Sequence, residues 1–421
     1  MIKKSNIYLH FTLLVSILLT GIVGCDRPES SSHRSINELD KVAELVQVGN
    51  HQVTVLDFAL LRDEVILPLS YLTEELRIVR LDNRDEALVA ETGVKIGNQH
   101  ILVSGTLTNR LPFRLFNKYG EFITNIGGFG QGPGEWSSSV PAWQLDEKNN
   151  RIYLMPGFQN RILVYDLSGR FLDFIPMPFR LTNMYSFYVD MENGLVTVFA
   201  PPVADDRFMP TYCAWVQNFS GEIIHGISAD FIEIDLNCDS PKPIGVFSNR
   251  NNANVLDVHF FNVVTPRNDN DTLYHYDIKR NELIPRFSIN FGSRRIPLHV
   301  LSELPHHYIG YFFELTPCDQ FRGLYYRASP RSVIVDKETL RGGYFRLIND
   351  FLGNIEIRYP VFALTNGYFT ANLEPGTLLD KLEDALLNNE MSDEMRKNLV
   401  DIKNSIDINS NNYLLYARLR Q

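Results

Sequence analysis

A short sequence motif recurs along this chain of 421 residues and constrains its fold more than any other feature. Phe116–Phe122 (FNKYGEF) returns as Tyr165–Phe171 (YDLSGRF). Each copy indicates a strand, a tight turn at Asn/Asp-x-x-Gly, and a second strand that begins with Phe. A hairpin repeated in this way predicts a β architecture built from successive similar blades.

Weaker copies continue the repeat further along the chain. They begin at Gln217, Tyr276 and Val335, so successive starts, counted from residues 116 and 165, lie 49, 52, 59 and 59 residues apart. Apolar residues alternate with polar ones ahead of most copies, which indicates β-strands. Four short strands fill one such interval. We therefore expect an all-β, six-bladed β-propeller, with five blades from the repeats and a sixth from the chain ends.

The two chain ends contain the strands that the sixth blade needs. Val53–Leu56 and Leu76–Leu81 are strand-like near the N-terminus, and Asn412–Leu419 is strand-like near the C-terminus. Pairing of the first and last strands in one blade would remove the exposed edges of an open ring. We expect the propeller domain to span residues 51–421. A helical insertion at about 378–406, before the last strand, would either cover an edge or dock a partner.

The N-terminal segment predicts export and a membrane anchor. Residues 1–24 have the form of a signal peptide, with Lys3 and Lys4 ahead of an apolar stretch at Ile7–Leu19. That stretch is shorter than the roughly 20 residues that cross a bilayer. Ile22–Cys25 resembles the lipobox of bacterial lipoproteins, in which the peptidase cuts before the Cys and the Cys carries lipid. The resemblance implies lipidation of Cys25, with palmitate among the acyl chains, whereas an ordinary secretory signal is the alternative.

The residues after Cys25 are polar and lack periodicity, so we expect residues 25–50 to hold the lipidated Cys and a flexible tether. The whole chain has a net charge of −10. Loss of residues 1–24 removes two Lys and no acid, which leaves 38 basic and 50 acidic side chains and a charge of −12. This charge argues against a nucleic-acid partner.

Three cysteines remain after Cys25, namely Cys213, Cys238 and Cys318. An odd number leaves at least one of them unpaired. Their spacing does not match a zinc site. A disulfide can form between two of them in an oxidising compartment, and the sequence does not choose the pair.

A glycine-rich segment follows the first copy of the repeat and contains Gly130, Gly132, Pro133, Gly134 and Glu135. Its glycine spacing matches neither the dinucleotide fingerprint nor the P-loop. Glycines permit positive φ, and Pro133 fixes the turn before Gly134. The segment is expected to be a tight connection between blades, or else a group of backbone N–H donors that faces a ligand at the mouth of the ring.

Residues 112–175 carry a specific resemblance to a known family. The copy at 116–122 and the following Gly-x-Gly-Gln-Gly-Pro-Gly-Glu at 128–135 resemble the six-bladed β-propeller lipoproteins of Bacteroidetes, which are similar in shape to NHL and TolB-type propellers. The resemblance implies a cell-envelope protein, anchored by lipid and located at the outer membrane rather than the inner one. Asp26 after the Cys favours retention in the inner membrane under enterobacterial sorting rules, so the inner membrane is the alternative location.

Known linear motifs of enzymes are absent from the sequence, which contains neither Gly-x-Ser-x-Gly nor His-Glu-x-x-His. We therefore expect a non-enzymatic binding protein that holds a glycan, a peptide or a partner protein at the mouth of the ring, with no bound cofactor. The alternative is a hydrolase or lyase with Ca²⁺ or Zn²⁺ at the central channel, since ligands drawn from several blades escape linear motifs. Similar propellers support that alternative by analogy of fold alone.

Overall fold

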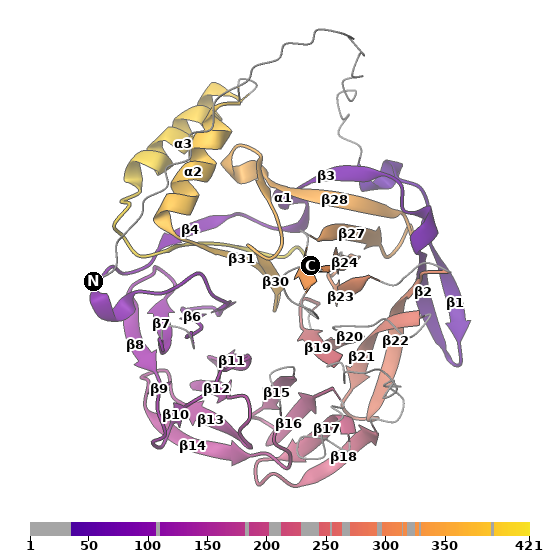
Figure 1. Ribbon diagram of the computed structural model, residues 1–421, viewed down its shortest axis with the longest axis vertical. Helices are drawn as coiled ribbons and strands as arrows, with labels where there is room; N and C mark the ends of the chain where they lie inside the picture. Colours follow the sequence, from indigo (N-terminus) through magenta and orange to yellow (C-terminus); the bar gives the residue numbers. More distant parts are fainter. Residues whose placement is uncertain are drawn as a thin grey trace, which may run out of the picture. The chain divides into compact units, whose positions relative to one another are not determined.

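The computed structural model of this chain describes residues 35–106, 110–181, 185–201, 212–228, 244–252, 255–262, 270–292, 297–313, 315–317, 325–327, 330–388 and 391–421. In the compact unit 34–421, six β-sheets with cores of four antiparallel strands are arranged as blades of a ring (Figure 1). The first strand of each blade is innermost. This arrangement confirms the predicted all-β, six-bladed propeller with a helical insertion before the last strand.

The blades are numbered along the chain. Blade 1 contains β5 (Val94–Ile96), β6 (His100–Val103), β7 (Phe113–Asn117) and β8 (Phe122–Ile126). Blade 2 contains β11 (Ala142–Asp146), β12 (Arg151–Met155), β13 (Arg161–Tyr165) and β14 (Phe171–Pro176). Blade 3 contains β15 (Ser186–Asp190), β16 (Leu195–Phe199), β17 (Tyr212–Asn218) and β18 (Ile223–Ser228).

The remaining blades follow in the same order. Blade 4 contains β19 (Ile244–Asn249), β20 (Asp257–Asn262), β21 (Asn270–Asp277) and β22 (Glu282–Asn290). Blade 5 contains β23 (Leu298–Glu303), β24 (His307–Phe313), β27 (Arg331–Asp336) and β28 (Gly342–Asn349), with β29 (Ile355–Ile357) beside β28. Blade 6 contains β30 (Ala363–Thr365), β31 (Tyr368–Leu373), β32 (Tyr413–Arg418) and β4 (Arg77–Arg80).

The recurring sequence motif forms the hairpin between the third and fourth strands of blades 1 to 5. In every copy an Asn or Asp side chain accepts a hydrogen bond from the backbone N–H two residues later, at 2.9–3.1 Å; the acceptors are Asn117, Asp166, Asn218, Asp277 and Asp336. The left-handed position of the turn is Gly in the first three copies, then Asn281 and Leu340, with φ of 52° and 60°. The last two copies of the repeat therefore lack the glycine, whereas all five keep the turn formed by the Asn or Asp side chain.

The ring closes in blade 6, where β4 pairs antiparallel with β32. This confirms that the first part of the chain and its last strand share a blade. The expectation for Val53–Leu56 was wrong, because β2 (His51–Asp57) instead runs parallel to β22 on the outside of blade 4. Likewise β3 (Glu64–Pro68) runs parallel to β28 of blade 5. Both strands cover edges that a four-stranded blade would leave unpaired.

The boundary predicted between a tether and the propeller at residue 50 is also wrong. A 3₁₀ helix at Ile36–Glu38 begins with a capping box at Ser35, whose N–H donates to Glu38 Oε2 at 3.1 Å. Leu39 is fully buried. The next strand, β1 (Ala43–Val48), forms a hairpin with β2. Polar residues separate the apolar ones in residues 35–50, so no periodic pattern in the sequence predicted this packing. Residues 1–34, including the signal peptide and Cys25, lie outside the described residues.

Six apolar clusters fill the interfaces between neighbouring blades. One joins Leu115 of blade 1 to Leu154 of blade 2, and equivalent clusters join the other neighbouring pairs. The last of these joins Leu414 of blade 6 to Ile101 and Phe116 of blade 1. Burial of apolar surface between blades thus continues around the whole ring, and this is the main stabilising term for such a fold.

The helical insertion lies between β31 and β32 and consists of α2 (Pro375–Leu386) and α3 (Asp393–Ser405). Pro375 occupies the first turn of α2, and the Ser392 side chain accepts from Met395 N–H to cap α3. Leu378, Leu382 and Leu399 are buried in the cluster of blades 5 and 6. The shorter elements are α1 (Leu69–Leu72), 3₁₀ turns at Phe58–Leu60, Asp85–Ala87 and Asp350–Leu352, and the strands β9 (Gly128–Phe129), β10 (Glu135–Trp136), β25 (Leu315–Pro317) and β26 (Tyr325–Arg327).

Candidate functional site

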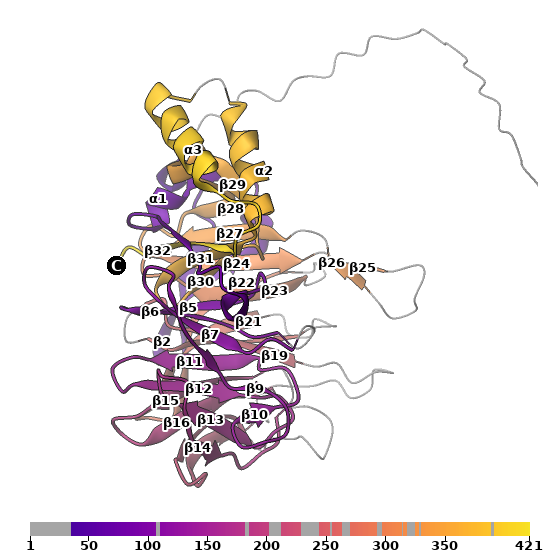
Figure 2. The same ribbon diagram turned by 90° about the vertical axis from the view of Figure 1, so that its left-hand side faces the viewer.

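A cavity of about 1060 Å³ lies at the centre of the ring. Its wall includes residues of the innermost strands β5, β11, β15, β19 and β30, together with Ser302 of β23 and Tyr311 of β24. All six blades therefore contribute to it. The C-terminal Gln421 also lines it, on the face of the ring opposite to β25 and β26 (Figure 2). A concave site of this volume suits a small organic ligand, and we refer to it as the central cavity.

Side-chain amides fix the wall of the central cavity by bonding to the backbone of other blades. Gln144 of blade 2 donates to the Val189 carbonyl at 3.0 Å and accepts from the Val189 N–H at 2.8 Å in blade 3. Asn249 and Asn251 of blade 4 donate to the Leu364 carbonyl of blade 6, at 2.8 and 3.0 Å. Because these amides have their partners already, the wall is preorganised rather than collapsible.

Two cations lie over aromatic rings in the wall. The Lys95 Nζ of blade 1 is 5.7 Å from the centroid of the Trp143 ring of blade 2. The Arg250 Cζ, next to the end of β19 in blade 4, is 4.3 Å from the centroid of the Tyr188 ring of blade 3. Both distances are in the range of cation–π attraction. Blades 1 and 4 face each other in a six-membered ring, so the two cations come from opposite walls.

Lys95 has few partners for a cation at this depth. Its Nζ donates to Thr365 Oγ1 at 3.2 Å, and no ion pair joins it to a carboxylate among the residues that the structure describes. An ammonium group carries three N–H donors, so one side-chain acceptor leaves capacity for others. Burial removes much of the hydration of the charged form, which lowers the pKa of Lys95 to about 8.

The carboxylates of the central cavity are occupied. Asp146 and Asp190 accept from the side chains of Asn149 and Asn193 at 2.8 and 2.7 Å, within their own turns. Glu192 pairs with Lys148. These three are the acidic side chains in the wall. None of the three forms an ion pair with Lys95, Arg250 or Arg418 in the described part of the chain, and the charges of Asp146 and Asp190 act on Lys148 instead.

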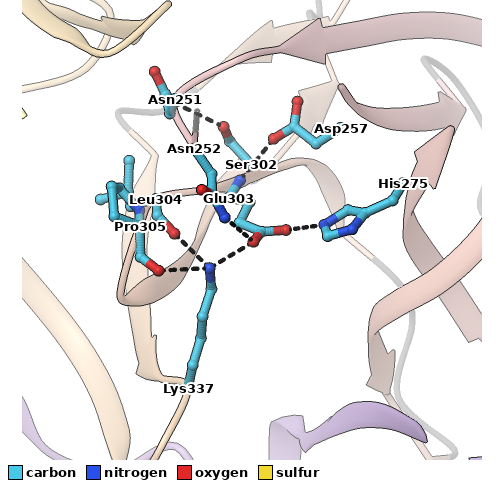
Figure 3. A network of polar contacts seen from close by, with 9 residues as sticks. All are labelled: Asn251, Asn252, Asp257, His275, Ser302, Glu303, Leu304, Pro305 and Lys337. Atoms are coloured by element: carbon cyan, nitrogen blue, oxygen red, sulfur yellow. Dashed lines mark hydrogen bonds and ion pairs between the residues drawn. The ribbon is translucent and has the colours of Figure 1, made fainter. Parts of the chain in front are cut away.

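A second group of polar residues lies between blades 4 and 5, behind the wall (Figure 3). Glu303, at the end of β23, pairs with His275 of β21 and with Lys337 after β27, whose Nζ is 2.5 Å from Glu303 Oε1. Lys337 Nζ also donates to the carbonyls of Leu304 and Pro305, at 2.6 and 2.9 Å. The three donors of this ammonium group thus have three acceptors. We call this group the blade 4–5 network.

Two acids of the blade 4–5 network have opposite pKa shifts. Burial alone would raise the pKa of Glu303, but the hydrogen bond from His275 and the charge of Lys337 outweigh it and lower the pKa to about 2. Burial raises the pKa of Asp257 to about 7, helped by the charge of nearby Glu303. Asp257 Oδ2 accepts from Glu303 N–H at 2.9 Å. The environment therefore favours an ionised Glu303 beside a protonated Asp257.

The glycine-rich segment lies away from the central cavity. None of its residues is in the cavity wall. Gly132 N–H donates to Glu135 Oε2 at 2.8 Å, and the Gly134 carbonyl accepts from the hydroxyl of Tyr165 in blade 2. Gly134 has φ of 74°, and a Cβ there would lie 2.6 Å from the Phe171 ring. These contacts are those of a tight connection between blades 1 and 2, which needs glycine for its conformation and its close packing.

The other residues that the sequence singled out have less to contribute. Cys213 carries a free thiol that is fully buried, and burial raises its pKa to about 12, which makes it unreactive. Cys25, Cys238 and Cys318 lie outside the described residues. Within the described ranges, no group of three or more His, Cys, Asp or Glu side chains could hold a metal ion.

Sequence reasoning missed the residues that line the central cavity. Lys95, Trp143, Tyr188 and Arg250 belong to four blades and form no linear motif. Their shared feature is a position in or beside the innermost strand of a blade. If the repeats are aligned on the Asn/Asp turn, the first strand of each blade can be located upstream of that turn. This alignment would have placed the four residues near the axis of the ring.

Comparison with known proteins finds one family and solved structures of low identity. The sequence profile of a family described as a domain of unknown function, DUF4934, matches residues 53–418. A protein of Bacteroides fragilis NCTC 9343 that is described as exported superposes with a TM-score of 0.56 at 17% identity, over 85% of this chain and 100% of that chain. A member of the DUF4221 family from Bacteroides vulgatus superposes with a TM-score of 0.46 at 11% identity, over 83% and 97%.

The first of these likenesses shows a shared fold and no more, because the identity is low. No curated protein matches the sequence. Among the helices in the described ranges, none is long and apolar enough to cross a bilayer.

Proposed function

This chain belongs to the DUF4934 family, and we propose that it is an exported, lipid-anchored binding protein that holds a ligand in its central cavity without transforming it. The observation that carries the proposal is the cavity itself, which is walled by all six blades and fixed by amide–backbone bonds between them. A preformed concave site with aromatic, amide and cationic groups has the composition of a binding site.

The absence of a metal-holding cluster among the described residues gives the alternative, a metal-dependent hydrolase or lyase, no structural support. The acids of the cavity wall are bonded to their own turns or to Lys148. A general base or nucleophile needs a side chain aimed at the reacting group, whereas these three acids are held by neighbouring side chains.

The binding proposal is tested by filling the cavity. Ala363 is an exposed residue of β30 in the cavity wall, and Ala363→Trp would occupy the space with an indole ring. We expect a panel of glycans and peptides to contain ligands that raise the melting temperature of the full chain in detergent, because binding to the folded state stabilises it. The Ala363→Trp variant should lose that response. Ala59→Trp, at an exposed site outside the cavity, is the matched control. Ligands that stabilise both variants equally would contradict the proposal.

Anchoring through Cys25 is the second part of the proposal, supported by the lipobox-like Ile22–Cys25 and by the exported description of the Bacteroides fragilis neighbour. We propose the outer membrane as its location. Cys25→Ser should move the protein from the membrane fraction to the soluble fraction, since lipid chains supply the membrane affinity. Cys213→Ser is the control and should remain in membranes. Mass spectrometry of the N-terminal peptide and separation of the two membranes by density measure the lipid and the location.

A further inference from the structure

The central cavity carries more positive charge than the rest of this acidic protein would suggest. The chain has 40 basic and 50 acidic residues. In the cavity wall, by contrast, Lys95, Lys148, Arg250 and Arg418 are matched by three acidic side chains and the carboxylate of the C-terminal Gln421. Lys148 pairs with Glu192 and is also influenced by the charges of Asp146 and Asp190, so the acidic side chains of the wall act on this one lysine. Three cations without a carboxylate partner among the described residues therefore line one cavity.

Lys95 is a half-buried cation of the cavity wall. Burial lowers its pKa to about 8, which means that the empty cavity disfavours its charged form. Its hydrogen-bonding partner, Thr365 Oγ1, is a neutral hydroxyl. A buried or half-buried cation without an anion costs free energy, and an arriving oxyanion would offset that cost.

Arg250 supplies a second cation from the opposite wall. Its guanidinium carbon lies 4.3 Å from the centroid of the Tyr188 ring, and no ion pair joins Arg250 to a carboxylate in the described chain. A guanidinium held in this way presents a fork of donors that matches the two oxygens of a carboxylate, sulfate or phosphate. Arg418 is exposed in the same cavity wall.

We propose that the central cavity binds a small organic oxyanion, whose carboxylate, sulfate or phosphate group is attracted by the positive charges of Lys95 and Arg250. The inference rests on the proposed binding function and adds the chemical class of the ligand. It assigns Lys95 and Arg250 as the residues that select for negative charge, and Trp143 and Tyr188 as the rings that position those two cations.

The test uses a set of probes that share one sugar ring and differ in charge: glucose, glucuronate, glucose 6-sulfate and glucose 6-phosphate, with inorganic sulfate as the bare anion. The full chain in detergent is titrated by calorimetry and by tryptophan fluorescence. Of its three tryptophans, Trp136 and Trp215 are buried in the blades and Trp143 lines the cavity, so Trp143 reports on occupancy. We expect one or more of the charged probes to bind at least about tenfold more tightly than glucose.

Variants assign the site. Lys95→Met and Arg250→Met should each weaken binding of the charged probe by about tenfold or more, since a charge-assisted hydrogen bond is lost. Lys95→Arg keeps the charge and should retain most of the binding. Lys397→Met removes the same charge from the exposed surface of α3 and is the control.

Three outcomes would overturn the inference: equal binding of glucose and the charged sugars, charged-probe binding that survives both methionine substitutions, or no binding by any oxyanion. The last outcome would leave the proposed function standing, because the Ala363→Trp comparison with a wider panel tests that function separately. The relative affinities of the three charged sugars distinguish a carboxylate from a sulfate or a phosphate ligand.

Discussion

Two lysines of this protein lie in partly buried sites and differ in nearly every contact. Lys337, in the blade 4–5 network, has an ion pair with Glu303 and two carbonyl acceptors (Figure 3). Lys95, in the central cavity, has a single hydroxyl acceptor and an aromatic ring. Burial lowers the pKa of both, but only for Lys337 does an adjacent acid act against that effect.

The comparison separates a polar group that serves the fold from one that remains available to a ligand. The blade 4–5 network satisfies its charges internally, and so removal of a member should damage the folded state. The cavity leaves a charge unsatisfied, and so its removal should relieve the folded state. A group that costs stability in the empty protein is a common property of functional sites.

The largest expected effect is in the blade 4–5 network. Glu303→Ala should destabilise the protein by about 3–5 kcal/mol, because it leaves Lys337 and His275 without their anion in a buried site. Chemical denaturation followed by circular dichroism measures the change. Glu356→Ala is the control, since it removes solvent-accessible pairs with Arg358 and Arg346 and should cost less than about 1 kcal/mol. Equal effects of the two substitutions would mean that the network does not stabilise the fold.

Lys95→Met should have the opposite sign and a smaller size. It removes a desolvated ammonium that has no carboxylate partner in the described chain, and we expect a gain on the order of 1 kcal/mol in the absence of ligand. The melting temperature of the ligand-free protein measures the change. A loss of stability comparable with that of Glu303→Ala would show that Lys95 is a structural residue and that the contrast between the two sites is false.

The pH dependence of the Lys95 effect has a definite sign. The folded-state pKa of about 8 lies below the unfolded value of about 10.4, so between these values the unfolded state binds more protons. The wild type should therefore gain stability relative to Lys95→Met as pH rises from about 8 to 10. A constant difference between the two proteins across this range would contradict the lowered pKa.

Asp257 gives a pH dependence of opposite sign in a different pH window. Its folded-state pKa of about 7 lies above the unfolded value of about 3.9, so its stabilising contribution is present at low pH and is lost as pH rises through 7. Asp257→Asn mimics the protonated acid and should remove this dependence, with its advantage over the wild type growing between about pH 4 and 7. Denaturation midpoints at several pH values measure it. Parallel curves for the two proteins would indicate an ionised Asp257 throughout.

The parts of the fold that the sequence predicted are those with a local cause. The Asn/Asp turns at Asn117 and Asp166 are satisfied by backbone groups a few residues away, so the pattern of letters was sufficient to find them. The helical insertion was likewise visible, because Leu378 and Leu382 lie on one helical face. The predicted boundary between tether and propeller was wrong because Ile36 and Leu39 become buried only through contact with blade 5. No local sequence pattern indicates that contact.

The candidate site shows the same limit more strongly. The glycine-rich segment attracted attention as a motif, and its residues lie outside the cavity wall. Lys95, Trp143, Tyr188 and Arg250 lie on four blades and had no pattern in common beyond ordinary strand residues. Their role depends on which side of an inner strand faces the axis, and that is set by packing between blades.

By itself the sequence determined the hairpin repeat, the number of blades and the joining of both chain ends in one blade, because turns and strand alternation arise from interactions between near neighbours. Only the tertiary structure decided where β2 and β3 add to the outer edges, which charges are neutralised, and which face a common cavity. Those outcomes depend on contacts between residues far apart in the chain, such as Lys95 with Trp143 and Thr365, whose free energies follow from burial and distance rather than from spacing along the sequence.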